Sequence, residues 1–207
     1  MPSLQQHNIT PEGEIDNMKI LALMGSPRLR GNTAILLSQF INGARAAGGE
    51  AEVVNLQEEN IHPCDACDIC ECGDKDFCVH NDSMRELMKK VGEADAFVLA
   101  TPVWWTGASS LTKIFLDRLY GYNTRKFFGG KGIYLITTFV DNRRFEHPLP
   151  GADIVGYAIQ SVSDFTGMEF LGHLRSAISG CVLDDTKILD KAFLEGKNFV
   201  KVLSHAK

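Results

Sequence analysis

Five cysteines lie within fifteen residues of this 207-residue chain, at positions 64, 67, 70, 72 and 78. In Cys64-x2-Cys67-x2-Cys70, followed by seven residues and Cys78, four thiolates can gather in one short loop. This is the ligand number and the compact spacing that a 4Fe-4S cluster uses. Cys72 could take the place of Cys78. The spacing therefore predicts a 4Fe-4S site on Cys64, Cys67, Cys70 and Cys78, with two alternatives: a zinc ion on the same thiolates, or free or regulatory thiols.

Other residues of this segment bear on the same chemistry. His62 and His80 flank the cysteines and offer further ligand atoms, although histidines in loops are more often simply exposed. The segment is acidic, which disfavours an anionic cluster and lowers its reduction potential; its carboxylates are Asp65, Asp68, Glu71, Asp74 and Asp76. The sixth cysteine, Cys181, stands alone and is expected to be a small buried residue.

A second motif, from Gly25 to Thr33, follows the apolar run at residues 19–24. The backbone N–H groups at the start of the helix that follows, with the hydroxyls of Ser26 and Thr33, form an anion site. The motif has neither Gly-x-Gly-x-x-Gly nor the Lys-Ser/Thr pair of a Walker A loop, so a monophosphate fits better than a dinucleotide. The alternative is that Ser26, Asn32 and Thr33 only cap the helix.

The elements that must position these residues alternate along the chain. Apolar runs predict strands at 19–24, 52–56, 94–101, 132–138 and around 168–172. Helical patterns begin at Asn32 or Thr33, at Asp82 as an N-cap, and at about 109, 152 and 186, while the cysteine-rich segment 61–80 has no period and is expected to be a loop insertion. Strands that alternate with helices predict an α/β domain with a five-stranded, mainly parallel sheet in three layers. In such domains ligands bind beyond the carboxyl ends of the strands.

Composition limits the class of protein further. A length of 207 residues suits one domain, expected over 18–207, with residues 1–17 as a disordered extension. The net charge of -5 and the pI near 5.7 disfavour nucleic acid and anionic membranes as partners. Neither a membrane-spanning run nor a secretory signal is apparent, so a cytoplasmic location is expected, in which thiols stay reduced.

Three motifs in this order resemble those of the flavodoxin-like NAD(P)H-dependent FMN reductases. They are Gly-Ser-Pro-Arg…Gly-Asn-Thr at 25–33, Ala-Thr-Pro-Val-Trp-Trp at 100–105, and Lys113 with Asp117-Arg118. The resemblance implies a sheet of order 2-1-3-4-5 with FMN between strands one and three. It also implies that the FMN phosphate is held by Ser26, Arg28, Asn32 and Thr33.

The same resemblance places the flavin ring. It implies that Pro102, Val103, Trp104 and Trp105 border the ring, with Trp104 packed near it, and that Thr138 touches its pyrimidine edge. Stacking on an aromatic side chain and backbone donors near the ring would tune the flavin. Lys113, Asp117 and Arg118 are expected to serve packing or a subunit contact.

The implied function is that of an FMN-dependent oxidoreductase. It would take a hydride from NADH or NADPH at FMN N5 and reduce flavin, quinone or another small acceptor, with no catalytic side chain. The cysteine segment also resembles that of the iron-sulfur flavoproteins, a branch of this family. The alternative is therefore an electron-transfer protein between ferredoxin and an acceptor, and a third interpretation is a redox-sensing or metal-binding module. A small-molecule acceptor or a redox protein is the expected partner, in a homodimer or homotetramer.

Overall fold

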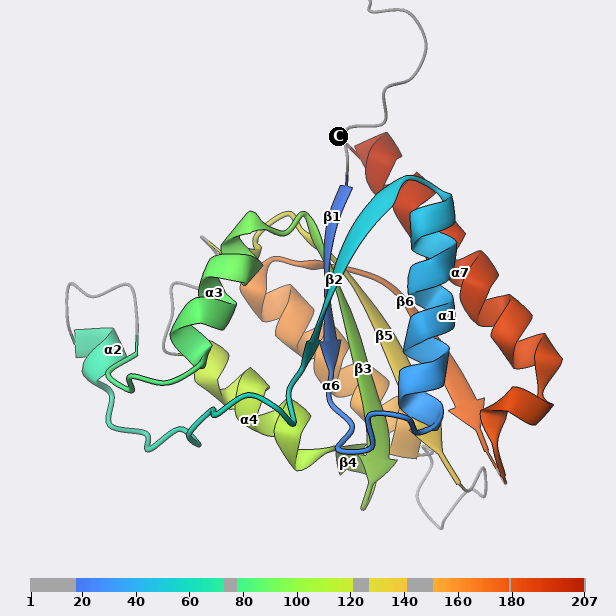
Figure 1. Cartoon of the computed structure of the whole chain (residues 1–207). Coiled ribbons are helices and arrows are strands. Elements are labelled where there is room, and N and C mark those ends of the chain that lie inside the picture. The colour runs from blue at the N-terminus through green and yellow to red at the C-terminus, as the bar shows by residue number, and fades with distance from the viewer. Residues whose placement is uncertain (1–17, 73–77, 121–126, 141–150, 179, 207) are drawn as a thin grey trace, which may run out of the picture.

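The computed structural model describes residues 18–72, 78–120, 127–140, 151–178 and 180–206 (Figure 1). The expectations for residues 1–17 lie outside these residues, and so does the polar stretch 141–150. No helix in the described ranges combines the length and the apolar composition needed to cross a bilayer.

A parallel sheet forms the centre of the molecule. Its strands are β1 (Met18–Met24), β2 (Gly49–Asn55), β3 (Ala96–Trp104), β5 (Gly132–Phe139) and β6 (Glu169–Ala177). Their order is β2-β1-β3-β5-β6, and every neighbouring pair is parallel. The short strand β4 (Gly107–Ala108) adds to β3 in antiparallel fashion. With β4 set aside, this is the predicted order 2-1-3-4-5, which is therefore confirmed.

Helices cover both faces of the sheet. One core joins the sheet to α1 (Asn32–Ala46) and α7 (Thr186–Ala206). The other joins it to α3 (Met84–Glu93), α4 (Ser110–Leu119) and α6 (Gly151–Thr166). Because alternate residues of β1 and β3 enter opposite cores, both faces of these strands are buried, as expected for apolar runs in a parallel sheet. The three layers of the prediction are present.

Two glycines allow α1 and α7 to pack with their backbones in close approach. A Cβ on Gly43 would lie 1.9 Å from the carbonyl oxygen of Phe193, and one on Gly196 would lie 1.9 Å from that of Phe40. No other residue type fits at either position without moving a helix. The pair fixes the distance between these two helices.

The register of the sheet brings the ends of three strands together. Met24 of β1 lies opposite Ala100 of β3, and Pro102 of β3 lies opposite Thr138 of β5. The N–H of Gly25 donates to Ala100 O at 2.7 Å, which ties the loop after β1 to β3. The motif at 25–33 and the Pro102–Trp104 segment therefore meet at one edge of the sheet.

Two element predictions need correction. The fifth strand runs from Glu169 to Ala177, well beyond residue 172, because its half-buried and polar residues lie on the last strand of the sheet and do not form an apolar run. The segment 61–80 is not entirely loop, because α2 (Ile69–Cys72) forms one helical turn within it. A single turn is too short to produce a visible period in the sequence.

Candidate functional site

A cavity of about 390 Å³ opens at the carboxyl edge of the sheet, beyond β1, β3 and β5. Its volume lies in the range of pockets that hold small ligands and cofactors. The lining comes from four segments: Ser26, Arg28, Gly31, Asn32 and Thr33; Pro102, Val103 and Trp104; Thr138, Phe139 and Val140; and Ile178, Gly180 and Cys181. Eight of the nine residues predicted to bind FMN thus surround one cavity.

The loop after β1 keeps the start of α1 open toward this cavity. Gly31 is the N-cap of α1 and has no side chain to bond the amides of the first turn, so the alternative that Ser26, Asn32 and Thr33 only cap the helix is wrong. The buried hydroxyl of Ser26 accepts a bond from the N–H of Arg28 at 3.2 Å, and Gly31 N–H donates to Arg28 O at 2.9 Å. A helix start without a side-chain cap, with Arg28 beside it, suits an anionic group.

Thr33 and Asn32 reach out from α1 to other parts of the cavity. The hydroxyls of Thr33 and Thr138 lie 2.7 Å apart in a buried hydrogen bond that joins α1 to the end of β5. Asn32 Nδ2 donates to Gly180 O at 2.9 Å, and its Oδ1 accepts from Val182 N–H at 3.0 Å. Both ends of the Asn32 amide are therefore used to hold the wall that follows β6.

The two tryptophans differ in their position. Trp104 lines the cavity and is 46% exposed, whereas Trp105 is fully exposed and is not among the lining residues. Trp105 and Thr106 both have positive φ, at 49° and 64°, and form the tight turn between β3 and β4. Such a turn matches the strand twist but is strained for residues other than Gly, Asn and Asp. The strain is located next to the cavity.

A second, small cavity of about 30 Å³ has Cys64, Cys67, Cys70 and Cys78 in its lining. Ala66 and Asp68 have positive φ, at 50° and 55°, which turns the backbone back between the cysteines. Ala66 N–H donates to Cys64 Sγ at 3.4 Å. The side chain of Cys72 lies outside what the structure describes, so the alternative that it replaces Cys78 stays a prediction.

The four thiols are close enough to influence one another. Burial raises the pKa of the Cys70 thiol, and the charges of Cys78, Cys67 and Cys64 raise it further, against a backbone hydrogen bond that lowers it. To act as ligands the four cysteines must be deprotonated, and four thiolates around one cavity would need a cation or a cluster to offset their repulsion. Together with the backbone donor at Cys64, they fit a 4Fe-4S cluster, whose sulfurs accept such bonds.

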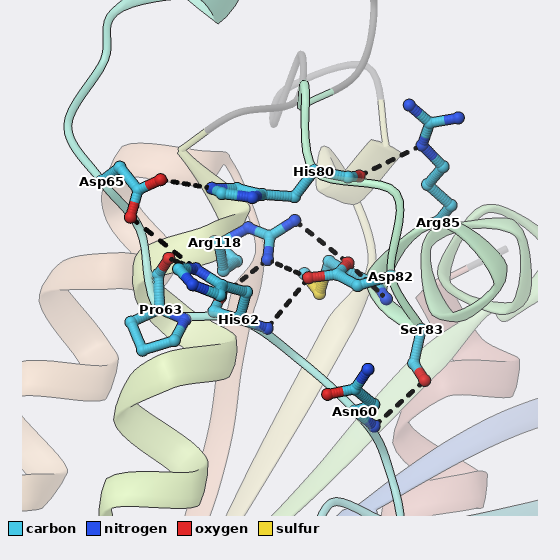
Figure 2. A network of polar contacts seen from close by, with 10 residues as sticks. Asn60, His62, Pro63, Asp65, His80, Asp82, Ser83, Arg85 and Arg118 are labelled. Carbon is cyan, nitrogen blue, oxygen red and sulfur yellow. Dashed lines mark hydrogen bonds and ion pairs between the residues drawn. The ribbon is translucent and has the colours of Figure 1, made fainter.

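A buried ion pair fastens the ends of the cysteine segment to α4 (Figure 2). The side chains of Arg118 and Asp82 are 0% and 7% exposed and form an ion pair. Arg118 also donates to His62 O at 2.7 Å, and the N–H groups of His62 and Met84 donate to the Asp82 carboxylate. Burial by itself would raise the pKa of Asp82, but these bonds and the charge of Arg118 hold it below its usual value.

The prediction that Asp82 caps α3 is only partly right. Ser83 is the N-cap residue and makes no side-chain capping bond, while Asp82, one position earlier, accepts from Met84 N–H at 3.1 Å. The expectation that Cys181 is buried is wrong, since Cys181 is exposed at the rim of the large cavity. Val182, at the start of the following turn, takes the buried position instead.

Comparison with known proteins agrees with this geometry. A family model described as NADPH-dependent FMN reductase matches residues 18–149. An iron-sulfur flavoprotein of Methanocaldococcus jannaschii is 33% identical over 117 residues, which is 55% of this chain and 60% of that protein. The chain spans about half the length of the curated relatives it matches.

Two solved structures share the fold. A flavone reductase superimposes with a TM-score of 0.71 at 17% identity, over 92% of this chain and 65% of the other. A flavodoxin from the domain Archaea superimposes with a TM-score of 0.58 at 13% identity, over 91% of this chain and 100% of the other. The fold is flavodoxin-like, as the motifs predicted.

Proposed function

Because the chain belongs to the NADPH-dependent FMN reductase family, a family of flavin-dependent oxidoreductases, we propose that it functions as an iron-sulfur flavoprotein. It would hold FMN in the cavity at the strand ends and a 4Fe-4S cluster on Cys64, Cys67, Cys70 and Cys78, and carry electrons between a ferredoxin and an acceptor. The observation that carries this proposal is that these four cysteines, and not only their spacing, meet at one small cavity. The name of the relative from Methanocaldococcus jannaschii supports it.

In this proposal the chain itself positions the flavin. The start of α1, with Ser26 and Arg28, binds the phosphate through backbone N–H groups and positive charge. The backbone at Pro102 and Val103 and the indole of Trp104 border the ring, where an aromatic face offers a large contact area. When bound, FMN supplies a centre that accepts electrons either singly or as a hydride.

The chain would also stabilise the cysteine site. The polarised N–H of Ala66 donates to Cys64 Sγ and offsets negative charge on the thiolate. The Arg118–Asp82 pair keeps the two ends of the segment against α4. When bound, a cluster on these thiolates exchanges one electron at a time, at a potential set by such hydrogen bonds and by exposure to solvent.

A nicotinamide-dependent reductase is the second candidate, and the description of the matching family favours it. Hydride transfer to flavin N5 needs a stacked nicotinamide rather than a protein acid or base. The half-exposed Trp104 lies beside the open cavity in which such stacking would occur. Steady-state oxidation of NADH and NADPH by FMN-loaded protein separates the two candidates, because an electron-transfer protein oxidises neither.

The decisive experiment measures cofactor content. Protein purified without oxygen is assayed for FMN, iron and acid-labile sulfide on one sample. We expect one FMN with about four irons and four sulfides per chain, the content of a 4Fe-4S cluster. Flavin without iron and sulfide would overturn the proposal and leave the reductase.

Single cysteine variants identify the ligands. Cys70→Ser and Cys78→Ser should lose the cluster and keep FMN, while Cys72→Ser should keep both. Cys181→Ser, outside the segment, is the control and should keep its iron. Loss of iron in Cys72→Ser but not in Cys78→Ser would move the fourth ligand to Cys72.

We also propose a homodimer or homotetramer, and a small molecule or a redox protein as the electron acceptor. Sedimentation of the FMN-loaded protein tests the first part. Transfer of electrons from the dithionite-reduced sample to quinone and to ferredoxin tests the second.

A further inference from the structure

Three potential ligand side chains lie beside the cysteine cavity and take no part in the function proposed above. They are His62, Asp65 and His80, seen together in Figure 2. Their nearest ligand atoms all lie within 4.8 Å of one another. We propose that these three residues bind a divalent cation of the zinc class, at a site separate from the cysteine thiolates.

The geometry supports a shared ligand. The two imidazole rings are stacked, with centroids 4.6 Å apart and planes inclined by 23°. The Asp65 carboxylate bridges them, because Oδ2 lies 3.1 Å from His80 Nε2 and Oδ1 lies 3.7 Å from His62 Nδ1. Two imidazoles and a carboxylate are ligands that zinc accepts, with a fourth position left to water.

His80 contributes a nitrogen that contacts the Asp65 carboxylate but makes no hydrogen bond among the described residues. Its Nε2 atom is buried, and among the described residues it has no hydrogen-bond partner, since its contact with Asp65 lacks hydrogen-bond geometry. A buried imidazole nitrogen in that state costs free energy, and a bound cation would offset this cost. His62 Nδ1, which faces Asp65 Oδ1, also lies 2.8 Å from Pro63 O, so an ion bound through this nitrogen would take the place of that contact.

Only a small rearrangement is needed to bind an ion. Zinc–nitrogen and zinc–oxygen distances of about 2.0–2.1 Å place tetrahedral ligand atoms about 3.3 Å apart, so no two of these atoms need approach by more than about 1.5 Å. The side chains of His62 and Asp65 are 58% and 53% exposed and can rotate, while His80, at 19%, stays in place. Their exposure also leaves the fourth position open to water.

The surrounding charge favours a cation. The charges of Arg118 and Asp82 offset one another in their buried pair, so Asp65 is the charge that faces the two histidines. The whole segment 61–80 carries five carboxylates and one lysine. A divalent ion would reduce this excess of negative charge.

The position of the site suggests what the ion does. His62 stands two residues before Cys64, and His80 stands two residues after Cys78. An ion held by both would close the base of the cysteine segment, as structural metals close loops elsewhere. This role does not depend on whether the cysteines hold a cluster.

Two charge-matched variants test the site. Equilibrium dialysis against Zn²⁺ is carried out on the whole protein, purified without oxygen, with iron and sulfide assayed on the same sample. We expect one Zn²⁺ per chain in the wild type and in Asp68→Asn, and at least about tenfold weaker binding in Asp65→Asn and His80→Gln. Asp68 lies in the same segment with positive φ, which asparagine also tolerates.

Two readouts guard against a false result. Co²⁺ in place of Zn²⁺ should give ligand-field bands without a thiolate-to-cobalt charge-transfer band, and Zn²⁺ should slow proteolysis between residues 62 and 80. Equal Zn²⁺ affinity in the wild type and Asp65→Asn, no binding to the wild type, or a thiolate band would each overturn the proposal. Absence of iron and sulfide would count only against the proposed function.

Discussion

Replacement of Asp82 by Asn tests whether the buried ion pair holds the cysteine segment to the fold. The side chain keeps its size but has one acceptor oxygen in place of two, so one of the N–H groups of His62 and Met84, which donate to different oxygens of Asp82, loses its acceptor. The negative charge opposite Arg118 is removed, and one of the two Arg118–Asp82 hydrogen bonds also loses its acceptor. Because Arg118 is 0% exposed, its positive charge then stays buried without the carboxylate of Asp82.

The size of the expected loss in unfolding free energy follows from the burial of this ion pair. Removal of one partner of a buried ion pair costs about 3–5 kcal/mol, whereas an exposed pair one helical turn apart contributes about 0.3–0.5 kcal/mol. The pair Lys113–Asp117 on the same helix is of the exposed kind, with side chains 63% and 46% exposed. Asp117→Asn is therefore the matched control.

The assay is urea unfolding of the wild type, Asp82→Asn, Asp117→Asn and the double variant Asp82→Asn/Arg118→Met. We expect the free energy of unfolding to fall by at least about 3 kcal/mol in Asp82→Asn and by less than about 1 kcal/mol in the control. The double variant should be more stable than Asp82→Asn, because the buried positive charge that lost its Asp82 carboxylate is gone. Limited proteolysis should cleave the cysteine segment of Asp82→Asn before the rest of the chain.

The pH dependence of stability at acidic pH provides a second test, because the direction of the change is defined. The folded pKa of Asp82 is lowered, so the stabilisation by its charge is fully present above the ordinary value of about 4 and is lost as the pH falls through the lowered pKa. The stability difference between wild type and Asp82→Asn should shrink in that window. The reasoning would be refuted if Asp82→Asn lost less than about 1 kcal/mol of unfolding free energy at neutral pH. It would also be refuted if the double variant were no more stable than Asp82→Asn.

Three further perturbations test other parts of the structure. Burial, with the charge of Arg175, lowers the pKa of His173 to about 4. The free energy of unfolding of the wild type should therefore decrease by about 1–2 kcal/mol as the pH falls from about 6.5 to 4. Urea unfolding of His173→Gln should lack this decrease. Gly43→Ala should lower the free energy of unfolding by about 2–3 kcal/mol in the same assay, because its Cβ would meet a backbone carbonyl of α7. Gly92→Ala in α3, whose Cβ would make only ordinary contacts with the ring of Phe127, should be neutral or stabilising. Asn32→Ala should weaken FMN binding about tenfold, measured by quenching of flavin fluorescence, since both bonds to the wall after β6 are lost; unchanged affinity would contradict that role.

Much of the architecture was predictable because its signals are local. The buried strands β1, β3 and β5 are apolar runs, and the helices between them carry apolar stripes. Once strands alternate with helices, the handedness of the crossovers leaves few topologies, and the ends of the strands become the place for a ligand. The loop at 25–33 and the spacing of the cysteines could be identified for the same reason, because both are local features of the sequence.

The partners of individual side chains were not predictable in this way. Asn32 was predicted to bind the phosphate, yet its side chain holds residues about 150 positions away, at Gly180 and Val182. Arg118 was expected in packing or a subunit contact, but nothing local indicated that it would be fully buried against Asp82. Periodicity reports which face of an element is apolar, and it says nothing about which residue of another element lies opposite.

The sequence by itself determined the class of fold, and it predicted the edge of the sheet for FMN and the cysteines for a cluster. Only the tertiary structure decided that four cysteines converge on one cavity, that His62 and His80 stack across Asp65, and that Trp105 lies outside the lining of the large cavity. The physical reason is the same in each case. Contacts between distant segments depend on how the core packs, and that packing is a property of the whole chain rather than of any one stretch.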